Sequence, residues 1–351
     1  MRKQIDYLIV GQGLAGSLLA HTLMARGASV HVFEGQLSLS ASRAAAGLIN
    51  PITGHRFNLT ERFAEFIEVA EATYTQLDKA AEHNLYRSER QWRLIKNAGQ
   101  RQYLEQRLQD PEYAPYLREA ASSEIFRASS EYGVAEILGG KVVNVNRLTA
   151  AVKTTLLKTE SLSETTFDHQ ALVNSEQGIK YHDFEARGII YCEGYRALRN
   201  PALTSLPFKL AKGDVLSVQQ GNASAFTHWL NWGQWLVPDD APHTAKLGSN
   251  YEWGSVDALE ANDTPSHADK LLQRAHEHTH YQLKLVDRVS GIRPSTRDRV
   301  PFVGPISTET NQYCFNGFGS KGCLLIPSYA QLLCDHLLLN KPLPKTVTQW
   351  L

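Results

Sequence analysis

Residues 5–34 read IDYLIVGQGLAGSLLAHTLMARGASVHVFE, and this stretch decides the fold. Its apolar run Tyr7–Val10 predicts a buried strand that leads directly into Gly11, Gly13 and Gly16. These glycines have the spacing G-x-G-x-x-G. A glycine cluster alone is usually only a turn, so the residues on either side of it decide its meaning.

The residues after the glycines complete a βαβ unit. Apolar side chains recur with the period of a helix up to Leu23, and Arg26 followed by Gly27 is typical of a helix C-terminus. A second strand is expected at residues 29–33, and Glu34 follows it directly. Strand, helix, second strand and terminal acid agree, and together they predict a dinucleotide-binding site.

Each of these residues suits a dinucleotide for a physical reason. Gly11 allows the tight turn, Gly13 lets the backbone approach a pyrophosphate, and Gly16 lets helix and strand pack closely. The helix N-terminus presents N–H groups and the positive end of its dipole to the same pyrophosphate. Glu34 can accept hydrogen bonds from the adenosine ribose, and its charge would repel the 2′-phosphate of NADP.

Length and composition limit the remaining possibilities. A chain of 351 residues can bury about three quarters of its unfolded surface, which is enough for two lobes. Its 36 lysines and arginines balance 36 aspartates and glutamates, so no overall field favours nucleic acid or an anionic membrane. We expect no apolar run long enough to span a membrane and no signal peptide. The four cysteines form no C-x-x-C pair, and we expect reduced, buried thiols in a cytoplasmic protein.

A second informative stretch is SASRAAAGLINPITGHRF, residues 40–57. The small residues 44–47 allow a backbone to lie against a flat ring without a side-chain collision. An ordinary small-residue loop is the alternative interpretation. Asn50, His55 and Arg56 follow, and they either reach such a ring or only close a turn.

The middle of the chain predicts scaffold elements of two domains. In chain order these are a helix with an apolar stripe from Phe63 to Leu77, a strand at 85–95, a helical stretch at 98–120 broken at Asp110-Pro111, strands from about Ala135, a helix at Thr149–Lys158 and a buried strand at Ala186–Tyr191. The first domain is expected to be discontinuous, with residues 1–84, 139–205 and 287–351. The second domain is expected to contain residues 85–138 and 206–286.

Residues 207–253 are predicted to be extended, with a turn at 238–242, and a helix is expected at 265–285. Five aromatic residues crowd this region, and we interpret them as packing residues rather than as pocket walls: Trp229, Trp232, Trp235, Tyr251 and Trp253. On the predicted helix, His276 and His280 have a spacing that a metal ion could use. No third ligand accompanies them, so we expect no metal site.

The C-terminal part carries a second chemical signal. A strand at 313–315 leads into the glycine loop 316–322, and a helix is expected at Pro327–Leu339. Such a loop offers backbone N–H groups to an anion, and a reduced flavin is one. A plain strand-to-helix turn is the alternative.

Four stretches together resemble the D-amino-acid oxidase (DAO) family of FAD-dependent oxidoreductases. They are YLIVGQGLAG (7–16) with Glu34, AAGLINP (45–51), GIRPSTRDRVPFVG (291–304) and NGFGSKG (316–322). The family includes glycine and sarcosine oxidases and the oxidase module of a bifunctional tRNA wobble-uridine enzyme. The resemblance covers nearly the whole chain. It implies an α/β fold of the glutathione-reductase/D-amino-acid-oxidase type, with a Rossmann-like FAD-binding domain and a second, mixed-sheet substrate domain.

The resemblance also implies the residues of the site. Val143 would lie near the adenine, Gly194 beneath the ribityl chain, and Arg293 and Lys321 would be catalytic, with Arg293 gripping a substrate carboxylate through its planar fork. The cofactor-binding residues would be Gly11, Gly13, Leu14, Ala15, Gly16, Glu34, Gly35, Arg43, Ala44, Ala45, Ala46, Gly47, Leu48, Val143, Cys192, Glu193, Gly194, Arg293, Gly317, Phe318, Gly319, Ser320, Lys321 and Gly322.

The chain departs from relatives in two places. Glycine oxidases carry an arginine in the last glycine loop, where this chain has Ser320 beside Lys321, which puts a second carboxylate contact in doubt. Sarcosine oxidases attach flavin through a cysteine upstream of that loop, and this chain has no cysteine between Cys192 and Cys314. We therefore expect FAD to bind non-covalently.

The activity implied is oxidation of the C–N bond of a primary or secondary amine, either an amino acid or an N-substituted glycine. Hydride would pass to flavin N5, water would hydrolyse the imine, and O₂ or another acceptor would reoxidise the flavin. Two alternatives remain open: an oxidase that modifies a carboxymethylaminomethyl wobble uridine in tRNA, and a flavin-carrying subunit that needs a partner. We expect a small-molecule partner rather than a nucleic acid, and the sequence leaves the substrate, the acceptor and the oligomeric state undecided.

Overall fold

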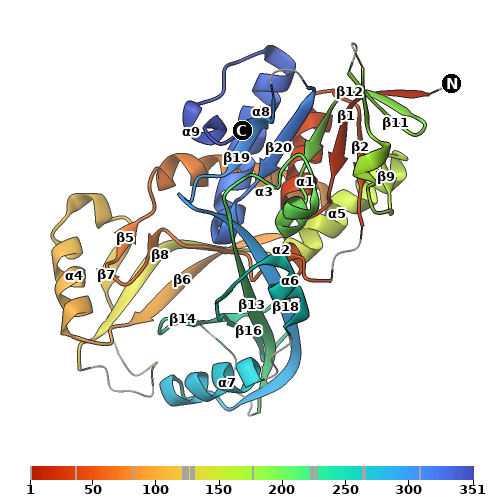
Figure 1. Ribbon diagram of the computed structural model, residues 1–351. Coiled ribbons are helices and arrows are strands. Elements are labelled where there is room, and N and C mark those ends of the chain that lie inside the picture. The colour runs from red at the N-terminus through yellow and green to blue at the C-terminus, as the bar shows by residue number, and fades with distance from the viewer. Residues whose placement is uncertain are drawn as a thin grey trace.

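The computed structural model describes most of the chain in two β-sheets with helices packed around them (Figure 1). The described residues are 2–35, 38–81, 84–120, 126, 131–175, 178–221, 226, 228–262, 266–307 and 310–351. The first sheet lies at the upper right of Figure 1 and contains β1, β2, β12 and β20. The second lies below it and contains β6, β8, β13, β16 and β18.

The first sheet is built around β1 (Lys3–Val10). This strand pairs in parallel with β2 (Val30–Phe33) on one side and with β12 (Phe184–Tyr191) on the other, and β12 pairs in parallel with β20 (Gln312–Asn316). Four further strands complete the eight strands found within the described residues: β9 (Leu162–Ser163), β10 (Val173–Ser175), β11 (Gly178–Tyr181) and β19 (Phe302–Pro305). The predicted strands at residues 7–10, 29–33 and 186–191 are confirmed.

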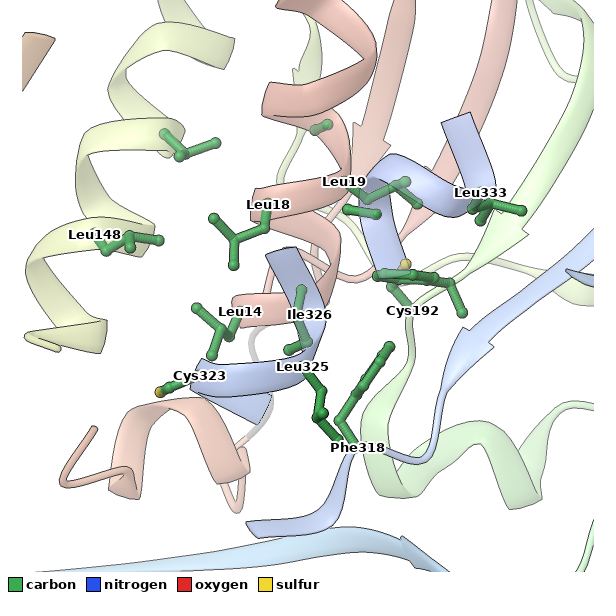
Figure 2. Packing of buried hydrophobic residues seen from close by; sticks show 14 of the residues in the cluster. Leu14, Leu18, Leu19, Leu148, Cys192, Phe318, Cys323, Leu325, Ile326 and Leu333 are labelled. Atoms are coloured by element: carbon green, nitrogen blue, oxygen red, sulfur yellow. The ribbon is translucent and has the colours of Figure 1, made fainter. Parts of the chain in front are cut away.

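Four helices cover this sheet: α1 (Leu14–Ala25), α3 (Phe63–Ala81), α5 (Val145–Lys158) and α8 (Gly322–Leu339). Leucines of α1 meet Leu325, Ile326 and Leu333 of α8 and Leu148 of α5 in one buried cluster (Figure 2). The apolar stripe predicted for α3 is also buried in this cluster, from Phe63 to Leu77. Burial of this shared face is the main force that holds the helices on the sheet.

The helix α8 begins five residues before the predicted start at Pro327, which lies inside it. Proline has no N–H, so it cannot bond the carbonyl four residues earlier, which is that of Cys323. The hydroxyl of Tyr74 on α3 donates to this carbonyl oxygen at 2.6 Å. The neighbouring helix thus satisfies the acceptor that the proline leaves free, and the helix continues through it.

By length and composition alone, the segment Gly319–Leu339 could cross a membrane, contrary to our expectation that no run is long enough. Its apolar side chains include Leu324, Ala330 and Leu333, which are buried in the cluster with α1 and α3. This packing is that of a core helix.

The second sheet contains ten strands within the described residues. They are β3 (Leu48–Ile49), β6 (Tyr86–Leu94), β7 (Leu117–Glu119), β8 (Val134–Val143), β13 (Phe208–Gln220), β14 (Trp229–Asn231), β15 (Trp235–Pro238), β16 (Thr244–Gly248), β17 (Glu252–Trp253) and β18 (Leu283–Thr296). The long strands β13 and β18 run antiparallel from Phe208↔Thr296 to Gln220↔Leu283. The domain boundaries stay a prediction, although β3 and part of β18 join this sheet from stretches assigned to the first domain.

The remaining elements belong neither to the two sheets nor to the four helices that cover the first sheet. They are the strand pair β4 (Ile52–Thr53) and β5 (Asn58–Leu59), the helices α2 (Ala41–Ala44), α4 (Ala98–Leu108), α6 (Val256–Ala261), α7 (Ser266–His278) and α9 (Lys345–Thr348), and 3₁₀ turns at Pro111–Tyr113, His169–Ala171, Gly194–Arg199 and Gly319–Lys321.

Two predicted helices are too long. The helical stretch 98–120 ends at Leu108, and Leu117–Glu119 forms strand β7 against β8. The helix predicted at 265–285 ends at His278, and Leu283 already begins β18. The first residue of that prediction, 265, lies outside the described residues. In both cases pairing with a distant strand overrides the local helical pattern.

Candidate functional site

A cleft with a cavity volume of about 220 Å³ lies between the two sheets. One wall comes from the glycine turn, Glu34, residues 40–42 and 44–48, and the end of β12. The other comes from β13, β15, β18 and the segment after β16. The residues around it include most of the predicted cofactor-binding set: Gly11, Gly13, Leu14, Ala15, Glu34, Ala44, Ala45, Ala46, Gly47, Leu48, Cys192, Glu193, Gly194, Arg293, Phe318, Gly319, Ser320 and Gly322.

The glycine turn that follows β1 has no room for side chains at Gly11 and Gly16. Gly11 has φ +100°, and a Cβ here would lie 2.5 Å from the carbonyl oxygen of Cys192. A Cβ on Gly16 would lie 1.8 Å from the Gly11 carbonyl oxygen, so Gly16 packs under the turn and does not line the cleft. Gly13 precedes the first residue of α1 and provides no side-chain cap. The first turn of α1 therefore faces the cleft as a site suited to an anion.

Two side chains hold this turn in place. The backbone N–H of Gln12 donates to Glu34 Oε2 at 2.5 Å, so the acid at the end of β2 is tied to the glycine turn. The N–H of Leu14 donates to Ser42 Oγ at 2.9 Å. Ser42 was missed by the sequence analysis, since a lone serine among small residues gives no signal.

The small-residue segment is fixed from behind by β8. Gly47 has φ +74°, and its carbonyl accepts the N–H of Val143 at 2.9 Å. Val143 is buried, does not line the cleft and supports Gly47 through its backbone; its place near the adenine stays a prediction. Arg43 points to a neighbouring surface depression, and Gly35 lies against Thr166.

The end of β12 brings a buried acid to the cleft. The Glu193 carboxylate accepts from Asn200 Nδ2 at 2.8 Å and pairs with His169 Nε2 at 2.8 Å. The next residue, Gly194, has φ +58°, and its carbonyl accepts from Asn316 Nδ2 at 2.9 Å. The ends of β12 and β20 are thus joined beneath the cleft.

The last glycine loop divides its residues between the cleft and the core. A Cβ on Gly317 would lie 2.6 Å from Thr296 Cγ2, so this glycine serves packing. Lys321 is not among the cleft residues, because its ammonium lies 3.4 Å from Thr60 Oγ1. Burial lowers the pKa of Lys321, and Arg299 lowers it further. The predicted catalytic role of Lys321 has no contact with the cleft to support it.

Arg293 on β18 projects into the cleft. Its Nη2 donates to Ser249 Oγ at 3.0 Å, and its Cζ lies 4.7 Å from the ring centre of Tyr251. Its Nη1 is buried without a hydrogen-bond partner. Burial lowers the pKa of the guanidinium, while Tyr251 and Asp214 oppose the shift. An unpaired, buried N–H donor is costly, so this position suits an anionic ligand.

The sequence analysis missed several residues on this side of the cleft. Gly213 gives room to the arginine, because a Cβ here would lie 2.5 Å from Arg293 Nη1. Trp235 and Tyr251 line the cleft, which corrects their interpretation as packing residues, whereas Trp229 and Trp232 are buried as expected. A glycine inside a strand, as at Gly213, is the signal that could have been used.

Asn50, His55 and Arg56 do not line the cleft. Asn50 accepts the N–H of Ile52 and donates to Gln91 Oε1, so it closes a turn. His280 lies beyond the end of α7, so it shares no helix face with His276. Within the described ranges no group of three or more side chains is placed to hold a metal ion. All four cysteines are buried free thiols.

Comparison with known proteins places the chain in a family. Residues 6–336 match the family DAO, described as FAD dependent oxidoreductase. The bifunctional tRNA 5-methylaminomethyl-2-thiouridine biosynthesis protein MnmC of Legionella pneumophila (strain Corby) is 23% identical over 97% of this chain. The alignment covers 56% of that relative, so the chain spans about half the length of the curated relatives it matches.

Solved structures share the fold over nearly their whole length. Glycine oxidase from Geobacillus kaustophilus has a TM-score of 0.78 at 19% identity, with 98% of this chain and 96% of that chain covered. Iminodiacetate oxidase (IdaA) from Chelativorans sp. BNC1 has a TM-score of 0.76 at 18% identity, with 97% of each chain covered. The glycine turn, the cleft and the family match lead to one conclusion: the chain belongs to the DAO family of FAD-dependent oxidoreductases.

Proposed function

We propose that this protein oxidises the C–N bond of a primary or secondary amine that carries a carboxylate, namely an amino acid or an N-substituted glycine. The observation that carries the proposal is the buried Nη1 of Arg293, which has no partner and belongs to a guanidinium that lines the cleft. Arginine presents two parallel N–H groups to a carboxylate, and here one N–H donor is already free for it.

The cleft fits FAD. The N-terminus of α1 at Leu14 would hold the pyrophosphate, Glu34 the adenosine ribose, and the small residues Ala44–Gly47 would lie along the ring. FAD held there would supply the hydride acceptor for the reaction, while the protein would supply orientation and electrostatics. The cofactor is proposed to be non-covalent, because both thiols at the cleft, Cys192 and Cys323, are buried and their pKa values are raised by burial.

The protein's own residues would select and orient the substrate. Arg293 fixes the carboxylate at one point, and Leu48 and Trp235 provide apolar walls beside it. Holding the amine in one orientation over the ring turns the reaction into an effectively unimolecular step. No side-chain base is assigned, and the geometry of Lys321 gives no support for one.

An anaerobic absorbance titration tests the proposal. The purified flavoprotein is titrated with glycine, sarcosine, iminodiacetate, and D- and L-amino acids, and bleaching of the flavin absorbance by one of them identifies the substrate class. Methylamine is the control, because it has an oxidisable C–N bond and no carboxylate. Equal bleaching by methylamine and by sarcosine would contradict a carboxylate anchor.

A second candidate function is the oxidation of a carboxymethylaminomethyl uridine in tRNA. The similarity to MnmC across 97% of this chain favours it, and this substrate is itself an N-substituted glycine. The neutral balance of 36 basic and 36 acidic residues argues against strong phosphate neutralisation. Two results together would favour this function. The protein would bind tRNA in a salt-sensitive way, and the modified nucleoside, but not sarcosine, would bleach the flavin absorbance.

A further inference from the structure

The segment after β16 interrupts the edge pairing of β13. Before the interruption Gly248 pairs with Val215, and after it Glu252 pairs with Lys212. Three residues, 249–251, therefore lie opposite two residues of β13. This is a β-bulge, which breaks the ladder locally and redirects side chains.

The side chain of Asn250 replaces the backbone partner that the bulge removes. Its Oδ1 accepts the N–H of Asp214 at 2.6 Å. Its Nδ2 lies 2.9 Å from His267 Nδ1 and 3.4 Å from Asp214 Oδ2. Asp214 is 3% exposed, and its other carboxylate oxygen accepts from Ser290 Oγ at 2.5 Å. Asn250 therefore acts as acceptor and donor at one buried point.

The residues on either side of Asn250 are the ones that hold the arginine. Ser249 Oγ accepts from Arg293 Nη2, and the ring of Tyr251 lies against the guanidinium. The backbone oxygen of Asn250 would lie 2.6 Å from a Cβ on Gly213, the same glycine that gives Arg293 its room. The position of the bulge and the position of the guanidinium are thus mutually dependent.

We propose that Asn250 is a positioning residue: it fixes residues 249–251 on β13 so that Ser249 and Tyr251 orient Arg293 toward a carboxylate ligand. This inference rests on the proposed function, since it assumes that Arg293 binds a carboxylate. Asparagine is required because the site needs one acceptor for a backbone N–H and one donor for Asp214. Aspartate has the same shape, but it would bring a second carboxylate against Asp214.

The test measures the binding of benzoate, an unreactive carboxylate, through its perturbation of the flavin absorbance of the holoprotein. Benzamide, its neutral analogue, reports contacts that do not depend on charge. Asn250→Ala is expected to weaken benzoate binding about five- to tenfold, as for the loss of one hydrogen bond, and to leave benzamide binding unchanged. For any oxidised amino acid, KM should rise by the same factor while kcat stays within about twofold.

The matched control is Asn231→Ala. Asn231 also accepts a backbone N–H through its Oδ1, from Gly233 at 2.9 Å, but it is the last residue of β14 and does not line the cleft. Both variants should lose thermal stability, and Asn250→Ala should lose more because its hydrogen bonds are more buried. Only Asn250→Ala should change benzoate affinity, a difference that a merely structural role would not produce.

A charge-conserving exchange distinguishes orientation from damage to the fold. Asn250→Asp alone places two carboxylates together and should weaken benzoate at least tenfold. The double variant Asn250→Asp with Asp214→Asn restores one acceptor and one donor between the two positions, and His267 can donate to the new carboxylate. Benzoate affinity in the double variant should return to within about threefold of the original.

The outcomes separate this inference from the proposed function. Two results would overturn the role of Asn250 but not the carboxylate anchor. In the first, benzoate binding is lost in Arg293→Ala but unchanged in Asn250→Ala. In the second, benzoate binding is lost in Arg293→Ala but is not recovered in the double variant. Benzoate binding that is unchanged in Arg293→Ala overturns the carboxylate anchor and this inference with it, as does the absence of any benzoate binding.

Discussion

The carbonyl oxygen of Val143 lies so close to Gly47 that a Cβ on this glycine would be 1.7 Å from it. The two residues join β8 to the small-residue segment, with the N–H of Val143 donated to the Gly47 carbonyl. This contact allows the segment to form a wall of the cleft, because any side chain at Gly47 would push it away from β8.

Gly47→Ala is expected to lose flavin. Its free energy of unfolding should fall by about 1–3 kcal/mol because the added Cβ overpacks the contact with β8. A further loss of about 1–2 kcal/mol is expected because alanine disfavours the left-handed backbone conformation. Gly54→Ala is the control, because Gly54 has φ +70° but nothing within 4 Å of the added Cβ. It should show only the conformational loss and keep its flavin. Flavin content and chemical denaturation measure the two effects, and equal losses in both variants would exclude the steric contact as the cause.

Arg293→Lys is expected to lower kcat/KM for a carboxylate substrate about 10- to 100-fold, because lysine retains the charge but loses the planar fork. Arg297→Lys, on an exposed residue of the same stretch, is the control. Steady-state kinetics with the substrate found by titration measure the effect. An unchanged kcat/KM for Arg293→Lys would show that a point charge is sufficient.

The thiols are expected to be unreactive in the native protein. Burial raises the pKa of Cys323 and of Cys334 to about 12, and raises that of Cys192 and Cys314 as well, so no thiolate is present at pH 8. A disulfide reagent should modify less than one thiol per chain in the native protein and all four after denaturation.

The flavin is expected to be released by acid. Acid precipitation should leave the flavin in the supernatant, and a yellow precipitate would indicate a covalent link.

His31 is expected to make stability pH-dependent. Burial, with a smaller effect of Lys3, lowers its pKa from 6.5 to about 4. Because the folded state binds this proton less readily than the unfolded state, the stabilisation is complete above about pH 6.5 and is lost as pH falls toward 4. The loss should be on the order of 1–3 kcal/mol. Urea denaturation of wild type and His31→Gln between pH 7 and 4.5 should give diverging curves, and parallel curves would contradict the assignment.

The first wall of the cleft could be predicted from the sequence because its determinants are local. The turn at Gly11–Gly16 and the acid at Glu34 follow one another within thirty residues, and each has a backbone reason to be there. The confirmed strands β1, β2 and β12 have apolar runs that indicate burial on both faces.

The second wall could not be predicted in this way because its residues meet only through long-range pairing. Ser249 and Tyr251 reach Arg293 through a bulge opposite β13, and no local pattern marks a bulge whose cause is a side-chain hydrogen bond. The same limit explains why the helix after residue 265 was predicted too long: strand β18 is formed by pairing with β13. The support that Val143 gives to Gly47 could not be predicted either, because it is made by backbone atoms, which carry no sequence signal.

The order of strands in the first sheet has a consequence during synthesis of the chain. The glycine turn follows β1, whose partner β12 is made about 180 residues later. Strand β20, which pairs with β12, is made about 300 residues after β1, and α8, which packs on α1, follows it. Non-local contacts of this kind form slowly and leave apolar surface exposed until they close. Until residues 302–339 have been made, the first βαβ unit therefore lacks the helix that buries its apolar face.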